Sequence, residues 1–185
     1  MDLKNVVMRE IVNIRDIDQI KKLESEYDFQ KALLLDKKLR LLIKEQSELR
    51  PLRKKLRRLL TEYEERVWSD TNRVSDKQLE ESEKAENVVE LERIFIKNRK
   101  DTIRKKLKEH DMTQQELGEL LGHSQSYISE LINGVSEFSI RDLVIIHRVF
   151  GIKLETLIPT YLQSETRERI NGIISRLNKP ELELK

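Results

Sequence analysis

The spacing of hydrophobic residues along the chain predicts a helical protein. One apolar stripe repeats at intervals of three and four residues, the period of one helix face, and consists of Leu52, Leu56, Leu59, Leu60, Tyr63 and Val67. Pro51 suits the first turn of this helix, where its missing N–H is not needed. A longer and less regular stripe precedes it, formed by Ile20, Leu23, Tyr27, Leu34, Leu35, Leu39, Leu42 and Ile43. We therefore expect helices at about 17–48 and 52–68, folded back on each other as a hairpin.

The expected hairpin buries little surface by itself. Each of its helices has a single apolar face, so the pair forms a thin core, which favours a partner or self-association. The first residues of the chain have a different pattern. β-Forming residues in partial alternation predict a short strand at about 5–14, and they are Val6, Val7, Met8, Ile11, Val12 and Ile14. The alternative for this segment is an ordered arm packed on the hairpin.

A third helix is predicted after a polar segment at 68–74. Ser75 and Gln78 match a capping box, and neither proline nor glycine occurs between them and His110. The charges along this helix are segregated, with mostly acidic residues at 76–92 and mostly basic residues at 97–108. This order suits the helix macrodipole. A solvated charged helix and a binding surface both fit the pattern.

Composition excludes several classes of protein. The 185 residues include 36 Lys and Arg, 34 Asp and Glu, and no cysteine, for a net charge of +2. Without cysteine there is no disulfide, thiolate zinc site or iron–sulfur cluster. None of the five glycines falls in the first 117 residues, so a glycine-rich phosphate loop or dinucleotide fingerprint is absent. The three histidines lack metal-ligand spacing, and we expect no metal, no cofactor and no enzyme activity.

The same composition bears on the location of the protein. No apolar run is long enough to span a membrane, and the N-terminus lacks the apolar stretch of a secretory signal. We therefore expect a cytoplasmic protein without a membrane partner.

From residue 98 the pattern changes to short helices with defined ends. Thr113 and Glu116 form a capping box, and Gly122 ends the helix that they begin. Ser124 caps a second short helix, which ends at Asn133 and Gly134. A third helix runs from about 139 to 151, and a last turn lies at about 153–158. Two short helices joined by a tight turn with glycine are typical of a helix-turn-helix.

The residues of this motif resemble a known family. The string T-Q-Q-E-L-G-E-L-L-G-H-S-Q-S-Y-I-S-E-L-I-N-G resembles the helix-turn-helix of phage-repressor-like (XRE/Cro) proteins, and the resemblance covers about 98–158. The following stretch, S-E-F-S-I-R-D-L-V-I-I-H-R-V-F-G-I-K-L-E-T-L-I, is similar to the corresponding part of HigA-type antitoxins. The first resemblance implies a five-helix, lambda-repressor-like fold that binds double-stranded operator DNA.

The second resemblance implies a toxin–antitoxin system. Its helical N-terminal region would neutralise a RelE-fold, HigB-type mRNA-cleaving toxin, and its C-terminal module would repress the shared operon as a homodimer. Two alternatives stay open. One is an XRE-family transcriptional regulator without a toxin partner, and the other is a helical interaction scaffold whose helix-turn-helix does not bind DNA.

The expected architecture is all-α, with the N-terminal helices joined to the C-terminal helix-turn-helix domain. We expect an interaction region at 1–75, an acidic connecting helix at 76–97, the DNA-binding domain at 98–160, and a C-terminal helix and tail at 161–185. The last helix carries an apolar stripe of Ile170, Ile173, Ile174 and Leu177. This stripe packs either on the preceding domain or in a dimer interface.

The XRE resemblance also implies roles for individual residues. The recognition helix maps onto 124–133, and the side chains that would read base edges are Gln125, Ser126, Tyr127 and Glu130. Glutamine suits adenine, serine either base type, glutamate cytosine, and a tyrosine ring the thymine methyl group. Phosphate contacts, which set the register on the duplex, are expected from Gln114, Ser124, Asn133, Arg104 and Lys105.

The charge of the motif conflicts with this role. Residues 112–163 contain three basic and six acidic residues, a net charge of −3, although phosphate neutralisation normally supplies much of the affinity for DNA. The missing charge would have to come from the basic run at 97–108. A second basic run, at 50–58, fits either a solvated amphipathic helix or a nucleic-acid backbone contact. We expect modest affinity of the monomer and a dimer across half-sites about 34–36 Å apart.

Overall fold

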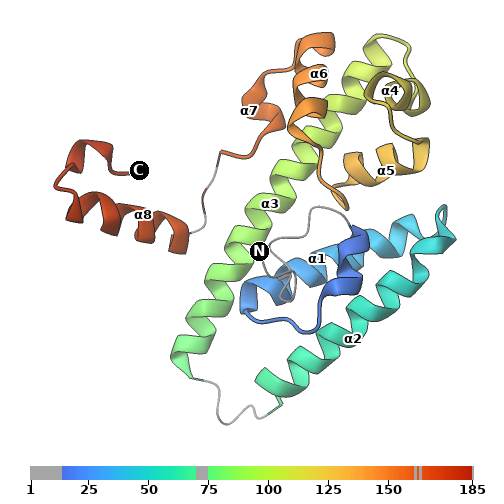
Figure 1. Ribbon diagram of the computed structural model, residues 1–185. Coiled ribbons are helices and arrows are strands. Elements are labelled where there is room, and N and C mark those ends of the chain that lie inside the picture. The colour runs from blue at the N-terminus through green and yellow to red at the C-terminus, as the bar shows by residue number, and fades with distance from the viewer. Residues whose placement is uncertain (1–13, 70–74, 161, 163, 185) are drawn as a thin grey trace.

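The computed structural model in Figure 1 describes residues 14–69, 75–160, 162 and 164–184. All regular secondary structure in these ranges is helical, which confirms the expected all-α fold. The strand expected at about 5–14 lies outside the described residues, except that Ile14 begins a short 3-10 helix, η2 (Ile14–Gln19).

The N-terminal unit, residues 14–69, contains the expected hairpin with different helix bounds. Its elements after η2 are α1 (Glu26–Leu42), the 3-10 helix η3 (Ser47–Leu49) and α2 (Arg50–Val67). The single helix expected at 17–48 is wrong in its extent. Ser25 accepts a hydrogen bond from the backbone N–H of Asp28, and the Asp28 carboxylate accepts one from that of Ser25, so a capping box begins α1 there.

The core of the N-terminal unit is thicker than a two-helix hairpin provides. The segment before α1 contributes Ile14, Ile17, Ile20 and Leu23, each at most 1% exposed. These side chains pack into one cluster with Leu39 of α1 and with Leu56 and Leu59 of α2. The segment therefore forms a third layer over the hairpin and covers apolar surface that the two helices alone leave open.

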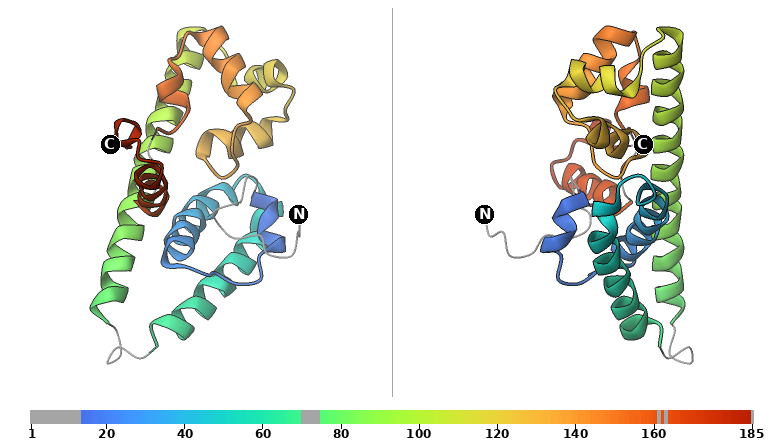
Figure 2. Two further views of the ribbon diagram at one scale, coloured as in Figure 1. Left: turned by 60° about the vertical axis from the view of Figure 1, so that its left-hand side comes forward. Right: turned by 90° about the vertical axis from the view of Figure 1, so that its right-hand side faces the viewer.

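The longest helix, α3 (Asp76–Glu109), has 34 residues and connects the two halves of the molecule. Its first half lies against α1, where the Tyr27 hydroxyl donates to Glu92 at 2.6 Å and Ser82 donates to Glu26 at 3.1 Å. Its last turns enter a second core through Ile103 and Leu107. Figures 1 and 2 show α3 running past both halves without a break. The Ser75 capping box predicted from the sequence is present at its start.

The second core belongs to four short helices and the end of α3. The helices are α4 (Gln114–Leu121), α5 (Gln125–Asn133), α6 (Ile140–Phe150) and α7 (Leu154–Leu157). Their buried side chains include Leu117, Ile128, Leu131, Ile146 and Leu157. Arg99 of α3 lies below this core, with its guanidinium 5.2 Å from the Phe95 and Phe138 ring centres. The five-helix arrangement expected from the sequence is therefore present.

The C-terminal helix, α8 (Ser164–Arg176), is followed by the short 3-10 helix η5 (Pro180–Leu182). In Figure 1 this pair stands apart from α6 and α7. Its internal contacts include the Asn171 amide, which donates to the carbonyl of Leu184 at 3.1 Å and accepts from its N–H at 2.9 Å. None of the helices in the described ranges combines the length and the apolar character needed to cross a membrane.

Candidate nucleic-acid interface

The start of α4 is fixed by the capping box predicted from the sequence. The Thr113 hydroxyl accepts from the Glu116 N–H at 3.2 Å, and the Thr113 N–H donates to the Glu116 carboxylate at 2.7 Å. The hydrogen bond from the Thr113 backbone lowers the pKa of Glu116. Leu117 and Leu121 then point into the core. This end of α4 is thus held by its own residues, independently of the rest of the chain.

Two glycines allow the turn between α4 and α5. A Cβ atom on Gly118 would lie 2.6 Å from the carbonyl oxygen of His123 and 3.3 Å from Ile128. The His123 N–H also donates to the Gly118 carbonyl at 2.8 Å, so the backbone folds back directly onto α4. Gly122 ends α4 with a φ of +76°, in the left-handed region that favours glycine. Together these features confirm the tight turn expected from the sequence.

Helix α5 is anchored on one side and exposed at its first turn. The Ser124 hydroxyl caps it by accepting from the Tyr127 N–H at 3.3 Å. Ile128, Leu131 and Ile132 are buried, whereas Gln125 and Ser126 are exposed. The result is a short helix whose N-terminal polar side chains project from the surface, the geometry with which a recognition helix enters a major groove.

Residues 103–157 match a family model described as Helix-turn-helix. The matched segment begins in the last turns of α3, ends with α7 and covers less than a third of the chain. It supports a DNA-binding regulator domain of the XRE type. No curated protein and no solved structure matches the chain. Residues 103–157 are the helix-turn-helix domain.

The structure contradicts the expectation that Glu130 faces the groove. Its side chain is 0% exposed, and the Arg15 guanidinium binds both carboxylate oxygens, at 2.9 and 3.0 Å. The Ser136 hydroxyl donates to the same carboxylate at 3.1 Å. Arg15 lies 115 positions earlier in the chain. Glu130 therefore faces the N-terminal unit, because that unit covers the side of α5 one turn beyond Ser126.

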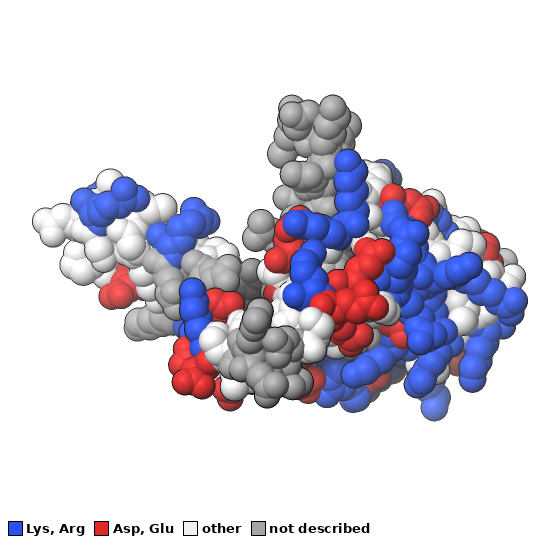
Figure 3. All heavy atoms as spheres, turned by 90° about the horizontal axis from the view of Figure 1, so that it is seen from below, with Lys and Arg blue, Asp and Glu red and all other residues white. Residues whose placement is uncertain are grey.

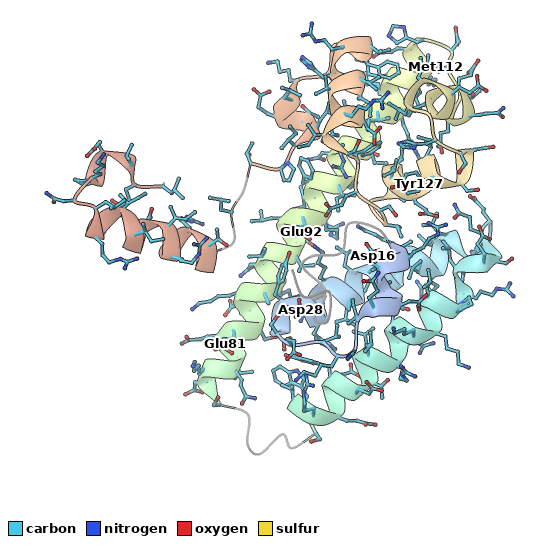
Figure 4. The ribbon with its side chains drawn as sticks, viewed as in Figure 1. Asp16, Asp28, Glu81, Glu92, Met112 and Tyr127 are labelled. Atoms are coloured by element: carbon cyan, nitrogen blue, oxygen red, sulfur yellow. The ribbon has the colours of Figure 1, made fainter. Side chains whose placement is uncertain are left out.

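Tyr127 is held against its own domain more than the sequence suggested. Its ring meets the His123 ring edge-on, with centroids 5.0 Å apart, and it packs beside the helix-turn-helix core. The Nε2 atom of His123 lies 3.1 Å from an oxygen of Asp142, which links the turn to α6. Figure 4 shows Tyr127 on α5 just above the segment of Asp16. Only part of the Tyr127 side chain is thus open to a partner.

The expected phosphate-contacting residues fall into two groups. Asn133 is partly exposed, and its amide accepts from Lys100 at 2.7 Å and donates to the Ser129 carbonyl at 2.7 Å. Its contact with a phosphate stays a prediction. Ser124 is exposed and Gln114 is partly exposed, each at the beginning of a helix. Arg104 and Lys105 are exposed on α3, and Lys105 lies 3.9 Å from Glu109.

The contact between α5 and the N-terminal unit was not foreseen from the sequence. The Gln46 amide donates to the Ser126 carbonyl at 3.1 Å, and the Lys38 ammonium donates to the Gly134 carbonyl at 2.9 Å. Burial lowers the pKa of Lys38 to about 8. Val135, in the loop after α5, is buried in the core of the N-terminal unit. The available signal was Val135 itself, an apolar residue directly after the glycine that ends α5.

The described residues hold no group of three or more His, Asp or Glu side chains placed to bind a metal ion.

Proposed function

We propose that the chain is a sequence-specific DNA-binding repressor that reads base edges with the first turn of α5. The observation that carries this proposal is the pair Gln125 and Ser126, exposed at the N-terminus of a helix whose opposite side is anchored. A glutamine bonds adenine through two atoms, and a serine accepts or donates to several bases. Tyr127 adds a contact to a thymine methyl group through its open edge. Glu130 has no part in base reading.

Phosphate contacts in this proposal come from the ends of helices. Gln114 and Ser124 begin α4 and α5, where free backbone N–H groups already favour an anion. Arg104 adds positive charge one helical turn from Lys100, whose ammonium reaches Asn133 of α5. Lys105 is the next residue along α3. These contacts set the position of the duplex and carry no sequence information.

The test is selection of bound duplexes from a random-sequence DNA library by the full chain. The Gln125→Ala, Ser126→Ala double variant should bind the selected duplex at least about tenfold more weakly, since one bidentate base contact contributes about 1–3 kcal/mol of discrimination. Gln115→Ala, an exposed glutamine on α4, is the matched control and should bind normally. If no sequence is enriched, the interaction scaffold becomes the better explanation. If the double variant keeps the wild-type preference, Gln125 and Ser126 do not read the bases and this proposal fails.

We also propose that the repressor is a homodimer. Ile170, Ile173 and Ile174 share one face of α8 and are only partly buried, and Figure 1 shows α8 apart from the helix-turn-helix domain. A second copy of α8 is an occupant that would cover this face. A two-fold dimer would place two α5 helices on half-sites about 34–36 Å apart.

The second candidate function is that of an antitoxin for a RelE/HigB-type toxin in the cytoplasm. The HigA-type resemblance suggests it, and one observation favours it: the first half of α3 presents exposed carboxylates, which are Glu80, Glu81, Glu83 and Glu86. A protein that cleaves mRNA has a basic surface, which these residues complement.

The antitoxin proposal is tested by co-purification with the product of the neighbouring reading frame. The wild-type chain should retain a basic, RelE-like protein and suppress its cleavage of mRNA. A Glu80→Lys, Glu83→Lys variant should lose that complex at moderate salt while still binding DNA. If the neighbouring product is not RelE-like, or if the chain does not bind it, the antitoxin proposal is wrong. The chain would then be a transcriptional regulator without a toxin partner.

A further inference from the structure

A shallow basic groove runs along α2, the helix at the lower right of Figure 1. It is lined by Ile43, Arg50, Arg53, Lys54, Arg57, Arg58 and Thr61, with no acidic residue among them. Figure 3 shows Lys and Arg side chains gathered over this side of the molecule. Five cations close together on one helix repel one another and destabilise it. An anionic partner bound in the groove would reduce this repulsion.

The cations differ in how firmly they are held. Arg53 is tied to the two oxygens of Asp36 at 2.8 and 3.1 Å, and Arg58 lies 3.4 Å from Glu62. Arg50, Lys54 and Arg57 make no ion pair with any residue in the described part of the chain. Their spacing of four and three residues places them on one helix face. Three cations are thus directed at the solvent in a row.

The length of the row suits a nucleic-acid strand. Arg57 lies seven positions after Arg50, which corresponds to about 10 Å along a helix. One strand of B-DNA advances about 3.4 Å per phosphate, so the row spans about three or four phosphates. The groove is open, which fits a backbone that is contacted from one side.

The groove also adjoins the recognition helix. Ile43 and Arg50 line its upper end, and Gln46, between them in the chain, donates to the Ser126 carbonyl at 3.1 Å. Ser126 is one of the residues proposed to read bases. A duplex lying along the first turn of α5 therefore meets the connection between α1 and α2 first, and the groove continues from there.

We propose that the basic groove on α2 binds the phosphate backbone of the same DNA duplex that α5 reads. This inference rests on the proposed DNA-binding function. It accounts for the net charge of −3 on residues 112–163, because the positive charge missing from the helix-turn-helix domain is supplied by the N-terminal unit. The basic run of α2 acts as the electrostatic part of a two-part DNA interface.

The experiment measures the salt dependence of binding to the selected duplex and to a scrambled duplex of equal length. Arg50→Gln, Lys54→Gln, Arg57→Gln is the test variant. Removing three cations that each contact a phosphate should reduce, by about 2.7, the slope of the logarithm of the binding constant against the logarithm of the salt concentration. Both duplexes should lose affinity by the same factor, so that the preference between them is unchanged. The charge-conserving variant Arg50→Lys, Arg57→Lys, in which Lys54 is unchanged, should have the wild-type slope.

A control variant removes the same charge elsewhere. Lys77→Gln, Lys84→Gln, Lys179→Gln alters exposed residues outside the groove and should keep the wild-type slope. If the wild type binds the selected duplex and the test variant has an unchanged slope, the groove is not a DNA contact, although the repressor function stands. If the wild type binds neither duplex, the proposed function itself fails.

Discussion

Arg15 and Glu130 join the two halves of the molecule through a bidentate ion pair with N–O distances of 2.9 and 3.0 Å. The carboxylate is fully buried, whereas about half of the arginine side chain is exposed. The pair raises the pKa of Arg15 through the hydrogen bond to Glu130. A buried carboxylate without its cation is unfavourable, so this contact holds α5 against the N-terminal unit.

Arg15→Ala should lower the free energy of unfolding by about 2–3 kcal/mol, because it leaves the Glu130 charge buried without its main partner. Chemical denaturation measures this change. Arg40→Ala, an exposed cation on α1, should stay within about 0.5 kcal/mol of the wild type. The Arg15→Ala, Glu130→Gln double variant should lose less stability than the sum of the losses in the two single variants. Fully additive losses would show that the pair is not coupled.

Gly118→Ala should destabilise the helix-turn-helix domain by about 1–3 kcal/mol, since the new methyl group overlaps the His123 carbonyl. This cost exceeds the gain of about 1 kcal/mol that alanine normally brings to a helix interior. Gly172→Ala is the matched control, because no described atom outside the adjoining backbone of α8 lies within 4 Å of the added Cβ. It should increase the far-UV circular dichroism of α8. Equal melting shifts for the two variants would contradict the predicted clash.

Lys38 should make stability depend on pH in the alkaline range. Burial lowers its pKa from 10.5 to about 8, so between these values the unfolded chain binds more protons than the folded one. The free energy of unfolding therefore rises with pH across this window. The contribution is on the order of 2 kcal/mol.

Denaturation of Lys38→Met at pH 8 and at pH 10 isolates this contribution. The wild type should gain stability relative to the variant between the two pH values. The difference cancels the effects of other groups that titrate there, such as Tyr63, whose pKa is raised by burial and by Glu26. A constant difference between wild type and variant would mean that Lys38 titrates normally.

Ile170→Asp, Ile174→Asp should convert a dimer into a monomer in sedimentation experiments, because two carboxylates would enter the proposed interface. The thermal unfolding of the helix-turn-helix domain should be unchanged, since α8 stands apart from it in Figure 1. Ser175→Asp, at an exposed position of the same helix, should remain dimeric. A wild-type chain that sediments as a monomer at tens of micromolar would remove α8 as the dimer interface.

Local signals made much of the fold predictable. The capping boxes at Ser75 and Thr113 and the left-handed glycine Gly122 depend on residues at most four positions apart, and each appears as expected. The apolar period identified the buried face of α2 for the same reason. The start of α1 was missed because the stripe continues through Ile20 and Leu23, which are buried although they lie outside any α-helix.

The candidate site was predictable only where it depends on α4 and α5 themselves. Exposure of Gln125 and Ser126 follows from helix period and the turn. The orientation of Glu130 does not, because its partner Arg15 is 115 positions away and no pattern in the sequence connects the two. Similarly, Asn133 is engaged by Lys100 from α3. Helix periodicity gives the side of a helix that a residue occupies, but not what covers that side.

Because α3 is uninterrupted, its length fixes both the distance and the relative rotation of the two halves of the molecule. Its first half lies on α1 and its last turns on the helix-turn-helix core, while Arg15 and Glu130 close the contact between the halves from the other side. Inserting one residue near its middle would rotate one half against the other by about 100° and shift it by about 1.5 Å. A seven-residue insertion would nearly restore the rotation but separate the halves by about 10 Å. Either change would separate Arg15 from Glu130 while α3 stayed packed on both halves. The contact between the halves therefore depends on the exact length of α3.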